Sequence, residues 1–214
     1  METFFPPETF PNSKNCLFIV IYRNPFDWLR SLHLQPHHTH PSLKNISFSK
    51  FIRTEWQCIW DEWANVHPDD DKYRKEMLFE RNPITGERFE NVIQLRNAKI
   101  KAFELLKKKV THIEYVRYED LVKEPDEFLN KLAEKYLLPL KNTFENIITY
   151  KGITPKTYKP KTYNEITPDD LEYIMINIDV AFERKIGYSL FFPSKLLSSF
   201  SFLLKKMKRF LFNP

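Results

Sequence analysis

The stretch Leu17–His33, LFIVIYRNPFDWLRSLH, contains the change of pattern that determines the expected fold. Residues 16–22 are apolar without a break and include β-branched side chains, which is typical of a strand buried on both faces of a parallel sheet. Asn24 is a favourable N-cap, and Pro25 suits the first helical position. The stretch therefore predicts a strand, a tight turn and a helix near residues 25–34.

Segments further along the chain alternate between the two patterns. VTHIEYVRY, at 110–118, predicts a second strand. Apolar spacing and terminal signals predict helices at 47–66, 91–109, 124–137 and 167–187. This alternation favours an α/β fold with a parallel sheet, although two strands are fewer than such a sheet usually has.

The composition narrows the class of protein. The 214 residues suffice for one domain with a sizeable core. The net charge is +5, and five basic residues with no acid fall between Ser189 and Pro214. Residues 1–188 are consequently neutral, which is not the profile of a nucleic-acid-binding core, and we expect no nucleic-acid partner.

The scarcity of glycine and cysteine argues against further classes of protein. Three glycines, none close to another, leave no glycine-rich phosphate loop. Two cysteines suggest no disulfide framework and favour a reducing compartment. No window of about 18 apolar residues predicts a membrane-spanning helix. The start of the chain shows no signal-peptide pattern, so we expect a cytoplasmic protein.

The end of the first predicted strand carries the main candidate site. Ligands of parallel α/β folds bind at the carboxyl ends of strands, where Arg23 lies and where Ser31 follows two helical turns later. A guanidinium can bind a phosphate through two parallel hydrogen bonds, and a hydroxyl can add a third. The alternative is that Arg23 pairs with a carboxylate and Ser31 is a small packing residue.

YRNPFDWLRSLH resembles the 3′-phosphate-binding segment of the sulfotransferase family. In that family an arginine at a strand end and a serine eight residues later hold the 3′-phosphate of 3′-phosphoadenosine 5′-phosphosulfate (PAPS), and Arg23 and Ser31 match this spacing. YVRYEDLVKEPDEFLNKLAEKYLL resembles the family's downstream strand, turn and helix. The resemblance implies that Tyr118 lies against the adenine, while Glu119 and Asp120 fix the turn.

Two further segments, NPITGERFENVIQLRNAKIKAF and AFERKIGYSL, look like parts of bacterial-type members. The resemblance covers roughly residues 4–190 and implies a P-loop-NTPase-like three-layer sandwich with a parallel sheet. We expect a sulfotransferase-like domain at 1–190 and a separate tail at 191–214.

One departure from the family concerns catalysis. The family's first strand leads into a loop that holds the 5′-phosphosulfate, and its usual catalytic histidine follows; neither has a counterpart here. We therefore expect a sulfotransferase domain that is incomplete at its N-terminus, with an open sheet edge that favours self-association. Its catalytic residues are not identified.

The resemblance implies transfer of a sulfuryl group from PAPS to an acceptor hydroxyl, without a metal. The bacterial-type segments favour a carbohydrate acceptor. The alternative is a non-catalytic remnant that serves as a nucleotide-binding or membrane-associated accessory module.

Other charged and aromatic groups have weaker interpretations. The histidines of SLHLQPHHTH are interpreted as loop residues near an acceptor pocket, with a catalytic base or a metal site as alternatives; they are His33, His37, His38 and His40. Arg96 and Lys99 are interpreted as a solvated basic face, with contact to the donor or an anionic acceptor as the alternative. The four tryptophans are interpreted as core, with an acceptor platform as the alternative; they are Trp28, Trp56, Trp60 and Trp63.

The tail is basic and amphipathic. On a helical wheel its leucines share one sector with Phe200, Met207 and Phe210, and its basic residues lie opposite. Phe202 and Phe212 fall on the basic side. This pattern is compatible with a helix docked on the domain or with an interfacial helix on an anionic membrane, which would give peripheral contact with the inner face of a membrane.

Overall fold

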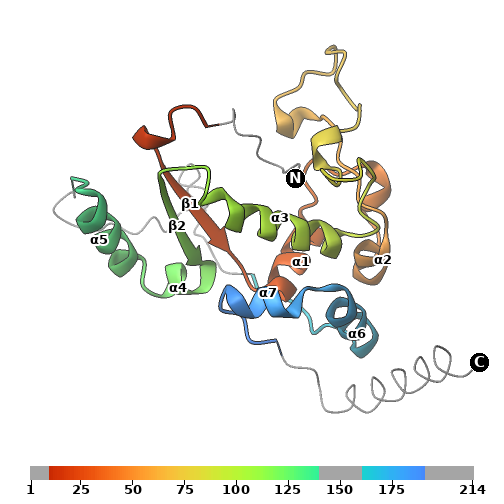
Figure 1. Ribbon diagram of the computed structural model, residues 1–214. Coiled ribbons are helices and arrows are strands. Elements are labelled where there is room, and N and C mark those ends of the chain that lie inside the picture. The colour runs from red at the N-terminus through yellow and green to blue at the C-terminus, as the bar shows by residue number, and fades with distance from the viewer. Residues whose placement is uncertain (1–9, 140–160, 191–214) are drawn as a thin grey trace, which may run out of the picture.

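The computed structural model describes residues 10–139 and 161–190, so the tail at 191–214 lies outside the described residues. Within these ranges the structure has seven α-helices and a small two-stranded parallel sheet, which confirms the α/β class (Figure 1). The elements are β1 (Leu17–Tyr22), α1 (Pro25–Leu34), α2 (Phe48–Arg53), α3 (Val92–Leu106), β2 (His112–Arg117), α4 (Tyr118–Lys123), α5 (Pro125–Tyr136), α6 (Pro168–Asn177) and α7 (Val180–Lys185). Short 3-10 helices cover Ser13–Asn15, Pro41–Leu43, Glu62–Ala64 and Leu78–Glu80.

The strand, turn and helix predicted for the opening stretch are confirmed. β1 ends at Tyr22, and α1 begins at Pro25. The side chain of Asn24 caps α1 by accepting hydrogen bonds from the backbone N–H groups of Phe26 and Asp27. The chain thus reverses direction within two residues at the end of β1.

The two strands lie parallel and in simple register, from Leu17 opposite His112 to Tyr22 opposite Arg117. Both arrowheads in Figure 1 point toward the side of the molecule where α4 and α7 lie. The residues that follow each strand therefore meet at one edge, as expected for parallel strands joined by a crossover.

One face of the sheet packs into the core against α3. Val20 and Tyr22 of β1 are buried on this face. The hydroxyl of Tyr22 donates to Glu104 of α3, and that of Tyr115 donates to the carbonyl of Phe103. Burial, followed by the neighbouring Glu104 carboxylate, raises the pKa of Tyr22 far above its usual range.

The opposite face is covered on the β2 side only. Lys135 and Tyr136 of α5 both donate to Glu114 of β2. On β1 the outward side chains of Ile19 and Ile21 remain 43% and 53% exposed. Exposed isoleucines on a strand show that half of this face has no cover among the described residues. Self-association through an open sheet edge stays a prediction.

The predicted helix at 47–66 is wrong beyond its first turns. α2 is capped by Ser47 as expected but ends at Arg53. The backbone beyond it bonds to distant segments: Trp56 donates to the carbonyl of Phe89, and Ile59 donates to that of His38. These long-range bonds replace the helical ones, so the apolar residues are held in an irregular loop. Trp63, interpreted as core, is 64% exposed.

The predicted helix at 167–187 is two helices. α6 ends at Asn177, where the backbone of Ile178 becomes extended. Asp179 then caps α7 by accepting from the backbone N–H of Phe182, while its own N–H donates to Asn97 of α3. The new cap turns α7 back toward α3. Gly187, with φ +95°, follows α7 as the predicted stop.

Among the described residues, none of the helices is both long and apolar enough to cross a bilayer.

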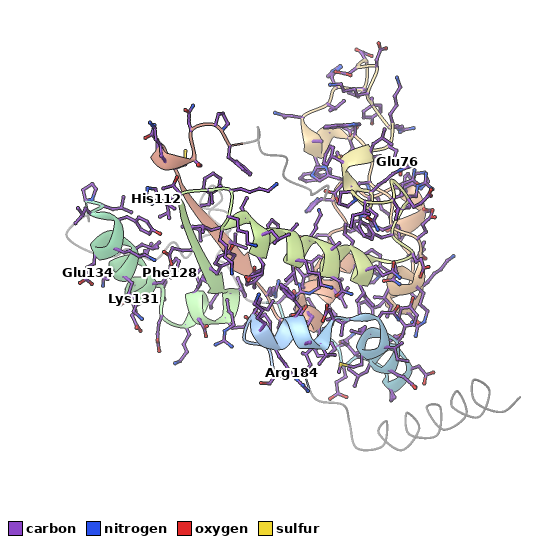
Figure 2. All side chains as sticks on the ribbon, in the orientation of Figure 1. Glu76, His112, Phe128, Lys131, Glu134 and Arg184 are labelled. Atoms are coloured by element: carbon purple, nitrogen blue, oxygen red, sulfur yellow. The ribbon has the colours of Figure 1, made fainter. Side chains whose placement is uncertain are left out.

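Ion pairs tie together the loop that follows α2. Glu76 accepts hydrogen bonds from Arg81 at 2.7 Å and from Arg88 at 2.8 Å. The bonds from Arg88, and then those from Arg81, lower the pKa of Glu76 to about 2. Figure 2 labels Glu76 in this loop, well apart from Arg184 on α7.

This cluster predicts a pH dependence of stability. Because the folded state lowers the pKa of Glu76 from 4.5 to about 2, its contribution is complete above pH 4.5 and is lost as the pH falls toward 2. We expect the difference in unfolding free energy between the wild type and Glu76→Gln to shrink over that range in urea titrations. A difference that stays constant with pH would contradict the assignment.

Candidate functional site

The carboxyl ends of the two strands bring together Arg23, which follows β1, and Tyr118, which follows β2. The guanidinium carbon of Arg23 lies 4.8 Å from the centroid of the Tyr118 ring. This is cation–π distance. Two of the three residues predicted for the donor site are therefore in contact.

The guanidinium of Arg23 has no acidic partner among the described residues. Its Nη2 donates to the hydroxyl of Tyr163 at 3.2 Å, and its Nε is buried with no hydrogen-bond partner in the described ranges. Other arginines do have carboxylate partners, namely Arg30, Arg53, Arg81, Arg88, Arg96 and Arg117. The alternative for Arg23, pairing with a carboxylate, is therefore not found within the described residues.

A buried ion pair fixes the backbone at Arg23. Arg96 of α3 donates to Glu183 of α7 through Nε at 2.6 Å and Nη2 at 3.0 Å, and the two residues are 4% and 1% exposed. The same Nη2 donates to the carbonyl of Arg23 at 2.9 Å. Trp28 of α1 covers the Arg96 guanidinium, with 5.1 Å to the ring centroid.

The interpretation of Arg96 and Lys99 as a solvated basic face is wrong. Arg96 is buried in the ion pair, and Lys99 donates to Glu80 at 2.7 Å. Each cation has an acidic partner far along the chain, which spacing within one helix cannot reveal.

Glu119 of α4 holds the turn between β1 and α1. Its Oε1 accepts from the backbone N–H of Asn24, and its Oε2 accepts from the hydroxyl of Tyr188, both at 2.8 Å. Burial and the bond to Glu119 raise the pKa of Tyr188 far above its usual range. Asp120 pairs with Arg117 at the end of β2. Asp120 thus braces the start of its own turn after β2, as the resemblance implied, whereas Glu119 holds the turn after β1.

Ser31 is the third predicted donor residue. It is half-buried in α1, seven residues after Asn24, which puts the two on the same face of the helix about 10 Å apart along its axis. Ser31 and Arg23 share no hydrogen bond in the structure. The geometry thus leaves open both a ligand contact and a packing role for Ser31.

A cavity of about 360 Å³ adjoins this region. It lies between the second half of α1, the start of α2 and the segment 162–166. Arg30 and Tyr163 line it, and Tyr163 also bonds Arg23. The prediction from sequence missed both residues, although Arg30 precedes Ser31 in the same motif and Tyr163 belongs to a stretch of alternating lysines and tyrosines.

The histidines do not converge on one centre. The Nε2 of His33 lies 2.7 Å from the carbonyl of Ile46, and Nδ1 of His38 lies 2.8 Å from Asp61. His40 accepts from the backbone N–H of Ser42, and His37 lies against Trp63. No group of three or more potential metal ligands occurs in residues 10–139 and 161–190.

Further basic residues follow residue 150 in the sequence. Lys151, Lys156 and Lys159 are outside the described residues, and Lys161 is exposed. Arg184 is exposed in the last turn of α7, where Lys185 pairs with Glu104 (Figure 2).

The fold and site define an α/β protein in which an arginine at the carboxyl edge of a parallel sheet has no carboxylate partner in the described part of the chain. Comparisons of the chain with protein-family models, with curated proteins and with solved structures returned no match.

The buried pair predicts a large loss of stability when one partner is removed. Arg96→Met leaves the Glu183 carboxylate buried without its counter-ion, and we expect the unfolding free energy to fall by about 3–5 kcal/mol. Arg117→Met is the matched control because its pair with Asp120 is partly exposed, and we expect it to cost about 1 kcal/mol or less. Equal urea midpoints for the two variants would contradict the role of the buried pair.

Proposed function

We propose that the chain is a sulfotransferase-type protein that binds the 3′-phosphate of PAPS at Arg23. The observation that carries the proposal is the half-buried Arg23 guanidinium, which lacks a carboxylate partner among the described residues and has a buried Nε without a partner. A phosphate would supply both the missing charge and the missing acceptor.

The position of Arg23 supports the same ligand. Nucleotides bind at the carboxyl ends of parallel strands in open α/β sheets, and Arg23 occupies that edge. Tyr118 presents an aromatic ring beside the guanidinium, where an adenine could stack. A P-loop-NTPase-like three-layer sandwich is the finer fold that accompanies this proposal.

Sulfuryl transfer would follow the same physics as phosphoryl transfer. The acceptor oxygen attacks sulfur in line, the bond from sulfur to the bridging oxygen breaks, and adenosine 3′,5′-bisphosphate leaves with the bond's electron pair. The hydroxyl proton passes to a base. A carbohydrate hydroxyl is the proposed acceptor. Arg23 would anchor the donor by its 3′-phosphate, away from the reacting sulfur.

Nucleotide binding without transfer is the second candidate function. The sequence offers no glycine-rich loop for the 5′-phosphosulfate, which favours this candidate. Both candidates use the same Arg23 site. Turnover of PAPS with a panel of hydroxyl acceptors separates them, because only the enzyme would release adenosine 3′,5′-bisphosphate.

The proposal predicts that Arg23→Ala weakens binding of adenosine 3′,5′-bisphosphate by about 2–4 kcal/mol, because a bidentate charge-assisted contact is lost. Ser31→Ala should cost about 1 kcal/mol if its hydroxyl contacts the phosphate. Calorimetry measures both changes, with the exposed Arg74→Ala as the matched arginine control. The 3′-phosphate assignment fails if the wild type binds the bisphosphate no more tightly than adenosine 5′-monophosphate.

A further inference from the structure

Two arginines approach one tyrosine ring near the end of β1. The guanidinium carbon of Arg23 lies 5.7 Å from the centroid of Tyr163, and that of Arg30 lies 5.2 Å from it. Tyr163 is 140 residues from Arg23 in the sequence, so its contact is made by the tertiary fold. The two positive groups and this ring therefore form one cluster.

The position of Arg30 follows from helix geometry. Side chains in an α-helix lean toward the N-terminus, so Arg30 in the second turn of α1 reaches back to Asp27 in the first turn. Its Nη2 donates to Asp27 at 2.8 Å, and its Nη1 donates to the carbonyl of Asn164 at 2.5 Å. Its Nε is buried without a partner, like that of Arg23.

Tyr163 is a weak partner for this cluster. Its hydroxyl accepts from Arg23 at 3.2 Å, which is long for a charge-assisted hydrogen bond. A phenol carries no charge that could neutralise a guanidinium. Within residues 10–139 and 161–190, the carboxylate that pairs with either arginine is Asp27, and it bonds Arg30 alone. The cluster thus has a net positive charge and two unused buried donors.

We propose that Arg23 and Arg30 together form a site for a doubly charged phosphate or sulfate group, and that Tyr163 fills this site until the anion displaces its hydroxyl. That the natural ligand is a nucleotide 3′-phosphate rests on the proposed function. The anion site itself rests on the two arginines and their unused donors. Arg30 is a second anion-binding residue, and Tyr163 is a competitor for Arg23.

The cavity next to the cluster provides room for this displacement. Tyr163 and Arg30 both line the space of about 360 Å³, whose other walls include Leu34, Phe48 and Ile166. An aromatic ring that leaves Arg23 can move into this mainly apolar space and remain buried. The cost of displacement is then chiefly the lost hydrogen bond to Arg23.

This arrangement has a definite effect on affinity. Only protein molecules in which Tyr163 has left Arg23 can bind the anion. The apparent dissociation constant therefore equals the intrinsic constant divided by the fraction of molecules in that state. Tyr163→Phe keeps the ring and removes only the hydroxyl. We expect it to bind anions about 5-fold more tightly, as the loss of one competing hydrogen bond implies.

The test compares the wild type with three variants by calorimetry, with inorganic sulfate and adenosine 3′,5′-bisphosphate as probes at constant ionic strength. Tyr73→Phe is the control for Tyr163→Phe because its hydroxyl bonds Glu62 in a distant surface loop. Arg30→Gln removes the second guanidinium, and we expect it to weaken both probes about 10-fold. Circular dichroism confirms that each variant is folded.

Each outcome decides the proposal. Tighter binding by Tyr163→Phe and weaker binding by Arg30→Gln, with Tyr73→Phe unchanged, supports it. Unchanged or weaker binding by Tyr163→Phe overturns the displacement, and unchanged binding by Arg30→Gln overturns the two-arginine site. If sulfate shows the expected pattern while the bisphosphate binds no better than adenosine 5′-monophosphate, the nucleotide function fails and the anion site stands. If no folded protein binds either probe, both fail.

Discussion

The buried pair of Arg96 and Glu183 is the constraint on which the candidate site depends. It joins α3 to α7, and through the carbonyl of Arg23 it also fixes the end of β1. Neither charge can stay buried without the other, because an isolated ion in the interior costs several kcal/mol. The three elements are therefore held together by a requirement for charge pairing as well as by apolar packing.

The two arginines at this edge have opposite roles because their surroundings differ. Arg96 has a bidentate carboxylate, an aromatic cover and a carbonyl acceptor, so its donors are used within the protein. Arg23, whose carbonyl Arg96 binds, has aromatic neighbours and one neutral hydroxyl. The first therefore stabilises the fold, while the second retains the charge and the donors that the proposed anion site requires.

Sequence patterns predicted the elements that are set by local signals. The apolar run before Asn24 and the cap itself give β1 and α1, because strand propensity and capping act over a few residues. The predictions of long helices at 47–66 and 167–187 were wrong at positions where the backbone hydrogen-bonds to distant residues, as at Trp56 and Asp179. The same limit applies to the site. Local sequence predicted Arg23 at a strand end, but it could not predict the contact with Tyr163, which lies 140 residues further along the chain.

An arginine without a counter-ion destabilises a protein unless other contacts hold its surroundings. Around Arg23 these contacts do not use its guanidinium: Glu119 binds Asn24 and Tyr188, and Arg96 binds the Arg23 carbonyl. The turn therefore keeps its shape whether or not an anion is present. A site whose backbone is already fixed loses little conformational entropy on binding, so more of the interaction energy appears as affinity. In the proposed site, a carboxylate beside Arg23 would stabilise the fold but would also block the anion, so the proposal requires Arg23 to keep its charge unpaired.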